Sequence, residues 1–233
     1  MTALKFWRGM SRGYDRLLMI VLIVILLIVC YCMYDNYWVY SHTIDDSILK
    51  YKPTAQGYVP SESPISDDMA AWLTIDGTNI DYPVMQSTDN IKYLNTDPYG
   101  GYSLSGSIFL DSRNSPEFTD RYSVIYGHHM EYGKMFGAID DFLDEDYLSA
   151  HSTGELIIGK DARKVYKLRV FAAMRASARS EEVFDVLKGG DPEYISSHAD
   201  VKISEPEGRI VALTTCAGSD QVSRIAVFCY IIE

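Results

Sequence analysis

Cysteine and positive charge are both scarce in this sequence, and the second scarcity excludes a class of protein. Only 4 of the 233 residues are cysteine, and 21 lysines and arginines face 32 aspartates and glutamates, for a net charge of −11. A nucleic-acid partner needs a basic footprint, so this balance argues against one. The simplest reason for the acidity is solubility, with weak steering of amine-bearing substrates as a further effect.

Internal repeats, low-complexity tracts and metal-ligand spacings are also missing. The adjacent histidines His128 and His129 cannot easily share one ion, and no nearby third ligand has a metal-binding spacing, so we expect no metal. With 47% hydrophobic residues, the length allows one well-buried domain plus an appendage.

The appendage is an uncharged apolar run from Leu17 to Tyr34. Its length is near the minimum of roughly 18 to 20 residues needed to cross a hydrocarbon core. Basic residues precede the run and Asp35 follows it, so the positive-inside rule places the N-terminus in the cytoplasm and the rest outside. A cleaved signal peptide is the competing interpretation, but the run is long for one and no small-residue cleavage pattern follows.

Residues that interrupt regular secondary structure, such as Pro53, Gly57 and Pro60, follow the apolar run and indicate a stalk before the compact domain. The predicted organisation is a cytoplasmic stub (1–16), a single plasma-membrane anchor (17–34), an extracellular stalk (35–66) and an extracellular domain (67–233).

Short apolar runs bounded by turn residues predict a mainly β domain. Eight strands are expected: WLTI, IDYPVMQ, SIFLD, YSVIYGH, GELIIG, KVYKLRVFAAM, RIVALTTC and RIAVFCYII. Two helical segments are expected at residues 134–151 and 180–200, the second broken at Gly189 and Gly190. Eight strands with peripheral helices indicate a closed or nearly closed barrel.

Cys216 and Cys229 are the two cysteines outside the apolar run, and an exported pair would ordinarily suggest a disulfide. If the last two strands pair antiparallel, Cys216 lies opposite Arg224 and Cys229 lies five residues further along. That separation is about 16 Å, beyond the limit of roughly 7 Å between bridged Cα atoms. A free thiol at Cys216 is therefore favoured, with Cys229 in the core.

A nucleophilic cysteine needs a neighbour that favours the thiolate, and Arg224 at the mouth of the same hairpin is one. Its guanidinium would also hold a developing oxyanion. The alternative is that Arg224 only caps an exposed strand end.

His128 is the preferred acid or base among the five histidines. It follows Gly127 at the end of an apolar strand, where backbone crowding is relieved and a rigid scaffold presents the side chain. The alternative is that His128 and His129 form a solvated turn.

Taken together, the glycine–histidine pair, the late Thr-Thr-Cys strand end and the arginine eight positions on resemble the sortases. These are the membrane-anchored cysteine transpeptidases of Gram-positive bacteria. The similarity runs from WLTIDGTNIDYPVMQ through STDNIKYL, GSIFLD, VIYGHHM and MFGAIDDF to the C-terminus, and looks like class B. Ala212 stands where many relatives have threonine, a minor departure.

The resemblance implies a sortase-type eight-stranded barrel with Cys216 as nucleophile, His128 as acid and base, and Arg224 as stabiliser of substrate and oxyanion. It also implies substrate-binding roles for residues before the cysteine and in the DNIKYL segment: Asn90, Leu94, Thr214 and Thr215. No cofactor is required.

The implied substrates are surface proteins with a C-terminal sorting signal, cleaved after threonine through a thioester. The implied acceptor is an amine of a cell-wall precursor, or a pilin lysine if the enzyme polymerises pilins. Two rivals remain on the residues alone: a secreted cysteine peptidase and a membrane-tethered binding domain. In papain-like enzymes, however, the cysteine is early and starts a helix.

Overall fold

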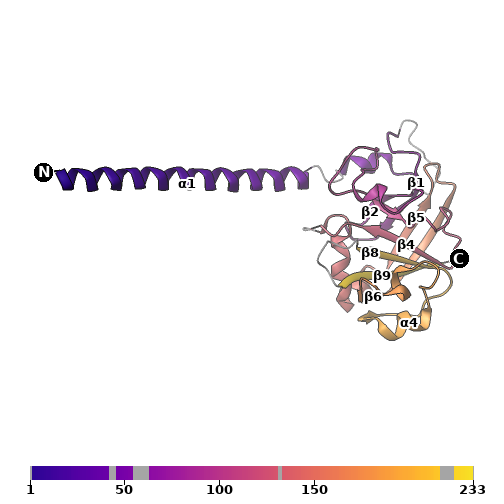
Figure 1. Ribbon diagram of the computed structural model, residues 1–233. Coiled ribbons are helices and arrows are strands. Elements are labelled where there is room, and N and C mark those ends of the chain that lie inside the picture. Colours follow the sequence, from indigo (N-terminus) through magenta and orange to yellow (C-terminus); the bar gives the residue numbers. More distant parts are fainter. Residues whose placement is uncertain (1, 42–45, 55–62, 131–132, 216–222, 233) are drawn as a thin grey trace. The chain divides into compact units, whose positions relative to one another are not determined.

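The computed structural model of the chain describes residues 2–41, 46–54, 63–130, 133–215 and 223–232. Contacts divide the chain into two units, Met1–Thr43 and Ile44–Glu233. The first unit is the helix α1 (Thr2–Ser41), and the second holds all the other elements (Figure 1). Within α1, Gly13–Asp35 has a mean hydropathy of 3.1 and is a candidate membrane span by length and composition.

Eight strands of the second unit close into a barrel, as predicted. Their order is β5-β1-β2-β3-β4-β8-β9-β6, and β6 pairs with β5 to complete the ring. Closure leaves these strands without free edges. They are β1 (Met69–Ile75), β2 (Asp81–Met85), β3 (Ile108–Leu110), β4 (Tyr122–Gly127), β5 (Thr153–Ile158), β6 (Lys164–Ser177), β8 (Ile210–Thr215) and β9 (Ser223–Ile232). The short strand β7 (Val201–Lys202) pairs with β6.

Strand β8 is buried along its whole length, which explains its continuous apolar sequence. Leu213 packs into the barrel interior, while Ala212 packs into a second cluster with residues of the peripheral helices. Strand β9 runs antiparallel to β8, and Val211 lies opposite Cys229. The predicted pairing of the last two strands is therefore confirmed, and Cys229 is a fully buried free thiol whose pKa burial raises to about 12.

The segment expected as one helix over 134–151 forms two, the 3-10 helix η4 (Phe136–Leu143) and the helix α2 (Glu145–Ala150). The division falls at Asp144, which has extended backbone and accepts a hydrogen bond from the Tyr147 amide at 2.8 Å. This side-chain cap starts a new helix. The second segment contains α3 (Glu181–Phe184) and α4 (Pro192–His198), with a break between them as expected.

Part of the segment expected as a stalk packs against the barrel unit. The 3-10 helix η1 (Asp46–Tyr51) buries Ile48 in a cluster with Ile65 and Trp72. Lys52 follows, and its Nζ donates to Thr74 Oγ1 and Asp81 Oδ1, each at 2.7 Å. Ile48, Tyr51 and Lys52 therefore attach this segment to the barrel unit, while the domain start at residue 67 stays a prediction.

Candidate active site

Two neighbouring parallel strands bring distant parts of the sequence to one end of the barrel. In the β4–β8 register, Gly127 lies opposite Thr215, so both strands end at the same level. His128 directly follows β4, and Cys216 directly follows Thr215 in the sequence but lies outside the described residues. Because Thr214 lies opposite Ala226 in the β8–β9 pair, Arg224 belongs to the same end of the barrel.

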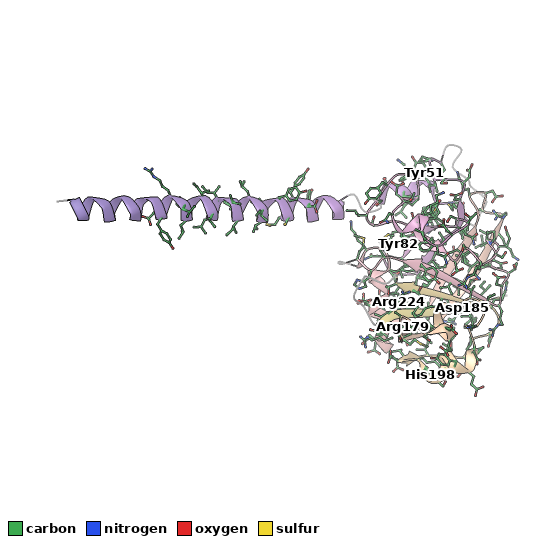
Figure 2. All side chains as sticks on the ribbon, viewed as in Figure 1. Tyr51, Tyr82, Arg179, Asp185, His198 and Arg224 are labelled. Atoms are coloured by element: carbon green, nitrogen blue, oxygen red, sulfur yellow. The ribbon has the colours of Figure 1, made fainter. Side chains whose placement is uncertain are left out.

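Side chains at these strand ends alternate between two faces, as strand geometry requires. Ile225 packs against the barrel interior. Arg224 points the other way, with its Cζ atom 5.1 Å from the centre of the Phe184 ring, and Phe184 packs against the second cluster. Figure 2 shows the position of Arg224.

His128 is half-buried and is held from the β2–β3 connection. Its Nε2 donates to the carbonyl oxygen of Leu94 at 2.9 Å, and Leu94 ends the 3-10 helix η2 (Lys92–Leu94). Burial lowers the pKa of His128, and the bond to the Leu94 carbonyl opposes that shift. The neutral imidazole therefore carries its proton on Nε2, which leaves Nδ1 as the nitrogen that can accept one.

Gly127 lets the chain pass through a crowded point just before His128. A Cβ atom at this position would lie 2.4 Å from Ile108 Cδ1 and 2.7 Å from Phe136 Cδ2. Real Cβ contacts are not that short, so a larger residue would displace η4 or β3. The crowding inferred from the sequence is thus an observed packing constraint.

The side chain of Arg224 has one hydrogen-bond donor that is left without a partner among the described residues. Within the described part of the chain, its Nε is buried and has no hydrogen-bond partner. Buried polar groups are nearly always paired, and such an orphan calls for an explanation. An N–H group held near Phe184 at the start of β9 is suited to donate a hydrogen bond to a carbonyl oxygen or an oxyanion.

A buried carboxylate, which the sequence analysis missed, organises this side of the barrel. Asp111 is fully buried and accepts hydrogen bonds from Arg113 Nε at 3.0 Å, Asn90 Nδ2 at 2.9 Å and Tyr126 Oη at 3.2 Å. Burial acts to raise the pKa of Asp111, but the hydrogen bonds and charge of Arg113 outweigh it and the pKa is lowered. The available signal was an acidic residue ending the apolar run SIFLD, followed two positions later by arginine.

The four residues expected to bind substrate occupy different environments. Asn90 is tied into the fold, because its Oδ1 also accepts from the Ser112 amide at 2.8 Å. Leu94 presents its carbonyl to His128. Thr214 is buried, with its Oγ1 donating to the Ile125 carbonyl at 3.3 Å, and Thr215 is buried at the end of β8.

A pocket of about 260 Å³ lies at the same end of the barrel. His129, Asp140, Arg175, Thr215 and Arg224 are among its lining residues. His129 Nε2 donates to Asp140 Oδ2 at 2.8 Å, so the second histidine has a carboxylate partner instead of being a merely solvated turn residue. Across the described ranges, no group of three His, Cys, Asp or Glu side chains is placed to hold a metal ion.

The barrel and the strand-end histidine and arginine define a scaffold for chemistry at the carboxyl ends of β4 and β8. Comparison with known proteins agrees. A family model described as "Sortase domain" matches residues 73–232. Sortase B of Listeria monocytogenes is 35% identical over 162 residues, which cover 65% of this chain and 64% of that protein. Sortase B of Staphylococcus aureus is 29% identical over 183 residues, covering 72% of each.

Solved structures show the same likeness. A class B sortase of Streptococcus pyogenes, described as involved in pilus biogenesis, superposes with a TM-score of 0.66 at 34% identity, over 73% of this chain and 94% of that one. A Staphylococcus aureus sortase B–substrate complex gives a TM-score of 0.63 at 27% identity, over 72% and 82%. The chain belongs to the sortase family. Its relatives place it with class B, as its motifs indicate. The match spans just under two thirds of the Listeria protein.

Proposed function

We propose that this chain is a membrane-anchored cysteine transpeptidase that cleaves a C-terminal sorting signal after threonine and joins the protein to an amine. Cys216 is the nucleophile, His128 the acid and base, and Arg224 the oxyanion stabiliser. The observation that supports the proposal is the pairing of Gly127 with Thr215, because β4 and β8 therefore end at the same level.

The β8–β9 register supports the partnership of Cys216 with Arg224. Thr214 lies opposite Ala226, so the same antiparallel count matches position 216 with position 224. By strand alternation, Thr214, Ala226 and Arg224 share one face, which is also the face of Phe184. A nucleophile there would have a guanidinium beside it.

In the first half-reaction the Cys216 thiolate attacks the carbonyl carbon of the substrate threonine. The negative charge that develops on the carbonyl oxygen is stabilised by Arg224, whose buried Nε donates to no other residue in the described ranges. Protonated His128 gives its proton to the departing amine as the C–N bond breaks. A thioester to Cys216 remains.

In the second half-reaction an amine attacks the thioester. Neutral His128 takes a proton from the attacking nitrogen through Nδ1, because Nε2 is committed to the Leu94 carbonyl. The C–S bond breaks and the thiolate returns. The lowered pKa of His128 favours the neutral form that this step needs, while the first step draws on a small protonated fraction.

The sorting signal would lie along the face that carries His128 and Arg224. Leu94 bounds this face from η2, and Asn90 fixes the start of the same connection through Asp111. Thr214 and Thr215 form the strand end beneath it. This assignment follows the family resemblance, and a Staphylococcus aureus sortase B has been solved in complex with substrate.

We propose that the candidate span anchors the domain outside the plasma membrane, because basic residues precede the span and the positive-inside rule would keep them in the cytoplasm. The acceptor is then an amine of a cell-wall precursor. Polymerisation of pilins through a lysine is the second candidate, favoured by likeness to the Streptococcus pyogenes enzyme involved in pilus biogenesis.

Mass spectrometry tests the chemistry directly. The full-length protein in detergent micelles is incubated with a library of sorting-signal peptides and an amine, and the cysteines are mapped. We expect an acyl adduct on Cys216 and none on the buried Cys229. Cys216→Ala should give neither adduct nor product while keeping the native circular dichroism spectrum. Turnover by Cys216→Ala, or no adduct from any peptide, contradicts the proposal.

A further inference from the structure

The pocket of about 260 Å³ lies at the strand ends that carry the proposed catalytic residues, and Arg224 is one of its lining residues. Arg175 and Ile225, which line it, are opposite each other in the β6–β9 register, and Ile225 packs against the barrel interior. Arg224 pairs with Ala176 one step earlier, and it lines the same pocket while its guanidinium lies over the Phe184 ring. The pocket also includes Thr215, the residue that precedes Cys216 in the sequence.

The carboxylate in this pocket is held in a fixed place. Asp140 lies on η4, which is anchored by the fully buried Phe136, Ile139 and Phe142. His129 donates to Asp140 Oδ2 at 2.8 Å, and the backbone of His129 bridges to Met135. The bond engages Oδ2 and leaves the charge and Oδ1 of Asp140 to interact with a ligand.

Arg175 brings a second, opposite charge to the same pocket. It lies near the end of β6, opposite Ile225, with an exposed residue surface. A carboxylate and a guanidinium lining one pocket complement a ligand that carries both an ammonium and a carboxylate. The volume is below the roughly 300 to 1,000 Å³ of sites for drug-sized ligands, which suits a group of amino-acid size.

We propose that this pocket binds the acceptor of the transfer step, and that the acceptor presents an amino group next to a carboxylate. Asp140 binds the ammonium, Arg175 binds the carboxylate, and His129 is a positioning residue that acts through Asp140. The proposal rests on the function proposed above, and it places the acceptor beside Arg224 at the end of β8.

The transfer step balances with these roles. The acceptor arrives as an ammonium at Asp140 and releases one proton to water. Its nitrogen then attacks the acyl carbon, and a second proton passes to His128 as the C–N bond forms. The C–S bond breaks and Cys216 leaves as thiolate. Water in place of the acceptor gives hydrolysis, so occupancy of the pocket decides the ratio of transfer to hydrolysis.

Glycine and glycinamide are the probes, because they differ only in the carboxylate next to the amine. Full-length protein in detergent micelles is given a peptide that acylates Cys216, and the ratio of transfer to hydrolysis is measured against acceptor concentration. We expect a lower acceptor KM for glycine than for glycinamide. Arg175→Gln should raise the KM for glycine about tenfold and leave that for glycinamide unchanged.

Asp140→Asn should raise the acceptor KM of both probes about tenfold, since it removes the charge facing the ammonium. Asp141→Asn is the matched control, because Asp141 is the next exposed residue of η4 and is not part of the pocket lining. His129→Ala should raise the acceptor KM while the rate of acylation by the peptide is retained. If His129 had only a structural role, the substitution would weaken acceptor binding and also lower the rate of acylation.

Equal effects of Asp140→Asn and Asp141→Asn, or no difference between the two probes in any variant, would overturn the inference. Formation of the adduct on Cys216 in the unaltered protein distinguishes failure of the proposed function from failure of the acceptor site alone. Without it the proposed function fails. With a normal adduct and an acceptor response that ignores Asp140 and Arg175, only the acceptor site fails.

Discussion

His128 and His129 are adjacent in the chain but have different surroundings, because successive residues at a strand end point to opposite faces. His128 is half-buried against the Leu94 carbonyl, and burial lowers its pKa. His129 is exposed and paired with Asp140. One histidine is therefore suited to exchange protons at neutral pH and the other to hold a carboxylate in place.

Replacing these histidines one at a time separates the roles. His128→Ala should lower kcat/KM for sorting-signal cleavage by about 10² to 10⁴-fold, the range for loss of an acid–base group. His129→Ala should lower it much less. Steady-state cleavage of a quenched fluorescent peptide measures both. Equal losses in the two variants would show that the histidine was assigned wrongly.

Arg224 has a buried Nε without a hydrogen-bond partner among the described residues, and its guanidinium lies over the Phe184 ring. Arg224→Ala should lower the acylation rate by about 10² to 10³-fold, as for loss of an oxyanion donor. Arg224→Lys should recover only part, because an ammonium lacks the planar fork and stacks differently. Single-turnover acylation is the measurement, and full rescue by lysine would reduce the role to charge alone.

At the scale of elements, the ends of β4, β8 and β9 form the site, and η4 closes one side of it. The packing of η4 against β4 leaves no room at Gly127, whose added Cβ would meet Ile108 and Phe136. The precise positions of His128 and of Asp140 therefore depend on the same contact. A substitution at Gly127 should therefore lower the rates of both half-reactions of the proposed mechanism.

Gly127→Ala should lower the free energy of unfolding by about 1 to 3 kcal/mol, the usual cost of overpacking. Chemical denaturation followed by fluorescence measures it. Gly100→Ala is the comparison variant, since Gly100 has a φ of +90° but nothing within 4 Å of an added Cβ. The loss of stability in Gly100→Ala should come from backbone strain alone, and the rate of sorting-signal cleavage should be unchanged. A Gly127→Ala protein of native stability and activity would contradict the packing argument.

At the scale of the whole molecule, the chain divides into a helix that carries the candidate span and a unit with its own core. The core extends beyond the barrel, because η1 buries Ile48 and Lys52 binds Asp81. We therefore predict that the stably folded second unit begins before η1 and not at residue 67.

Two fragments test this boundary. The fragment 44–233 should melt at a higher temperature than 67–233, because the shorter one loses the burial of Ile48, worth about 1.5 to 3 kcal/mol. For a unit of this size the expected difference is about 3 to 10 °C. Differential scanning calorimetry measures it. Identical melting temperatures would show that η1 adds nothing to stability.

The sequence by itself determined the strands and the apolar span, and it indicated His128 as the candidate acid and base. Each depends on local patterns: continuous apolar runs for buried strands, an uncharged stretch for the span, and a glycine before a histidine at a strand end. The eight-stranded barrel followed, because the number of strands and their closure are linked. The expected single helix over 134–151 was wrong because Asp144 caps a second helix there.

Only the tertiary structure decided which groups meet. His128 donates a hydrogen bond to Leu94, 34 residues away in the sequence, and Asn90 donates one to Asp111, 21 residues away. The pairing of His129 with Asp140 and the pocket shared with Arg175 depend on how η4 and β6 pack at the barrel end. Such contacts leave no periodic trace in the chain, because hydrogen-bond partners are set by strand register and packing and not by spacing along the sequence.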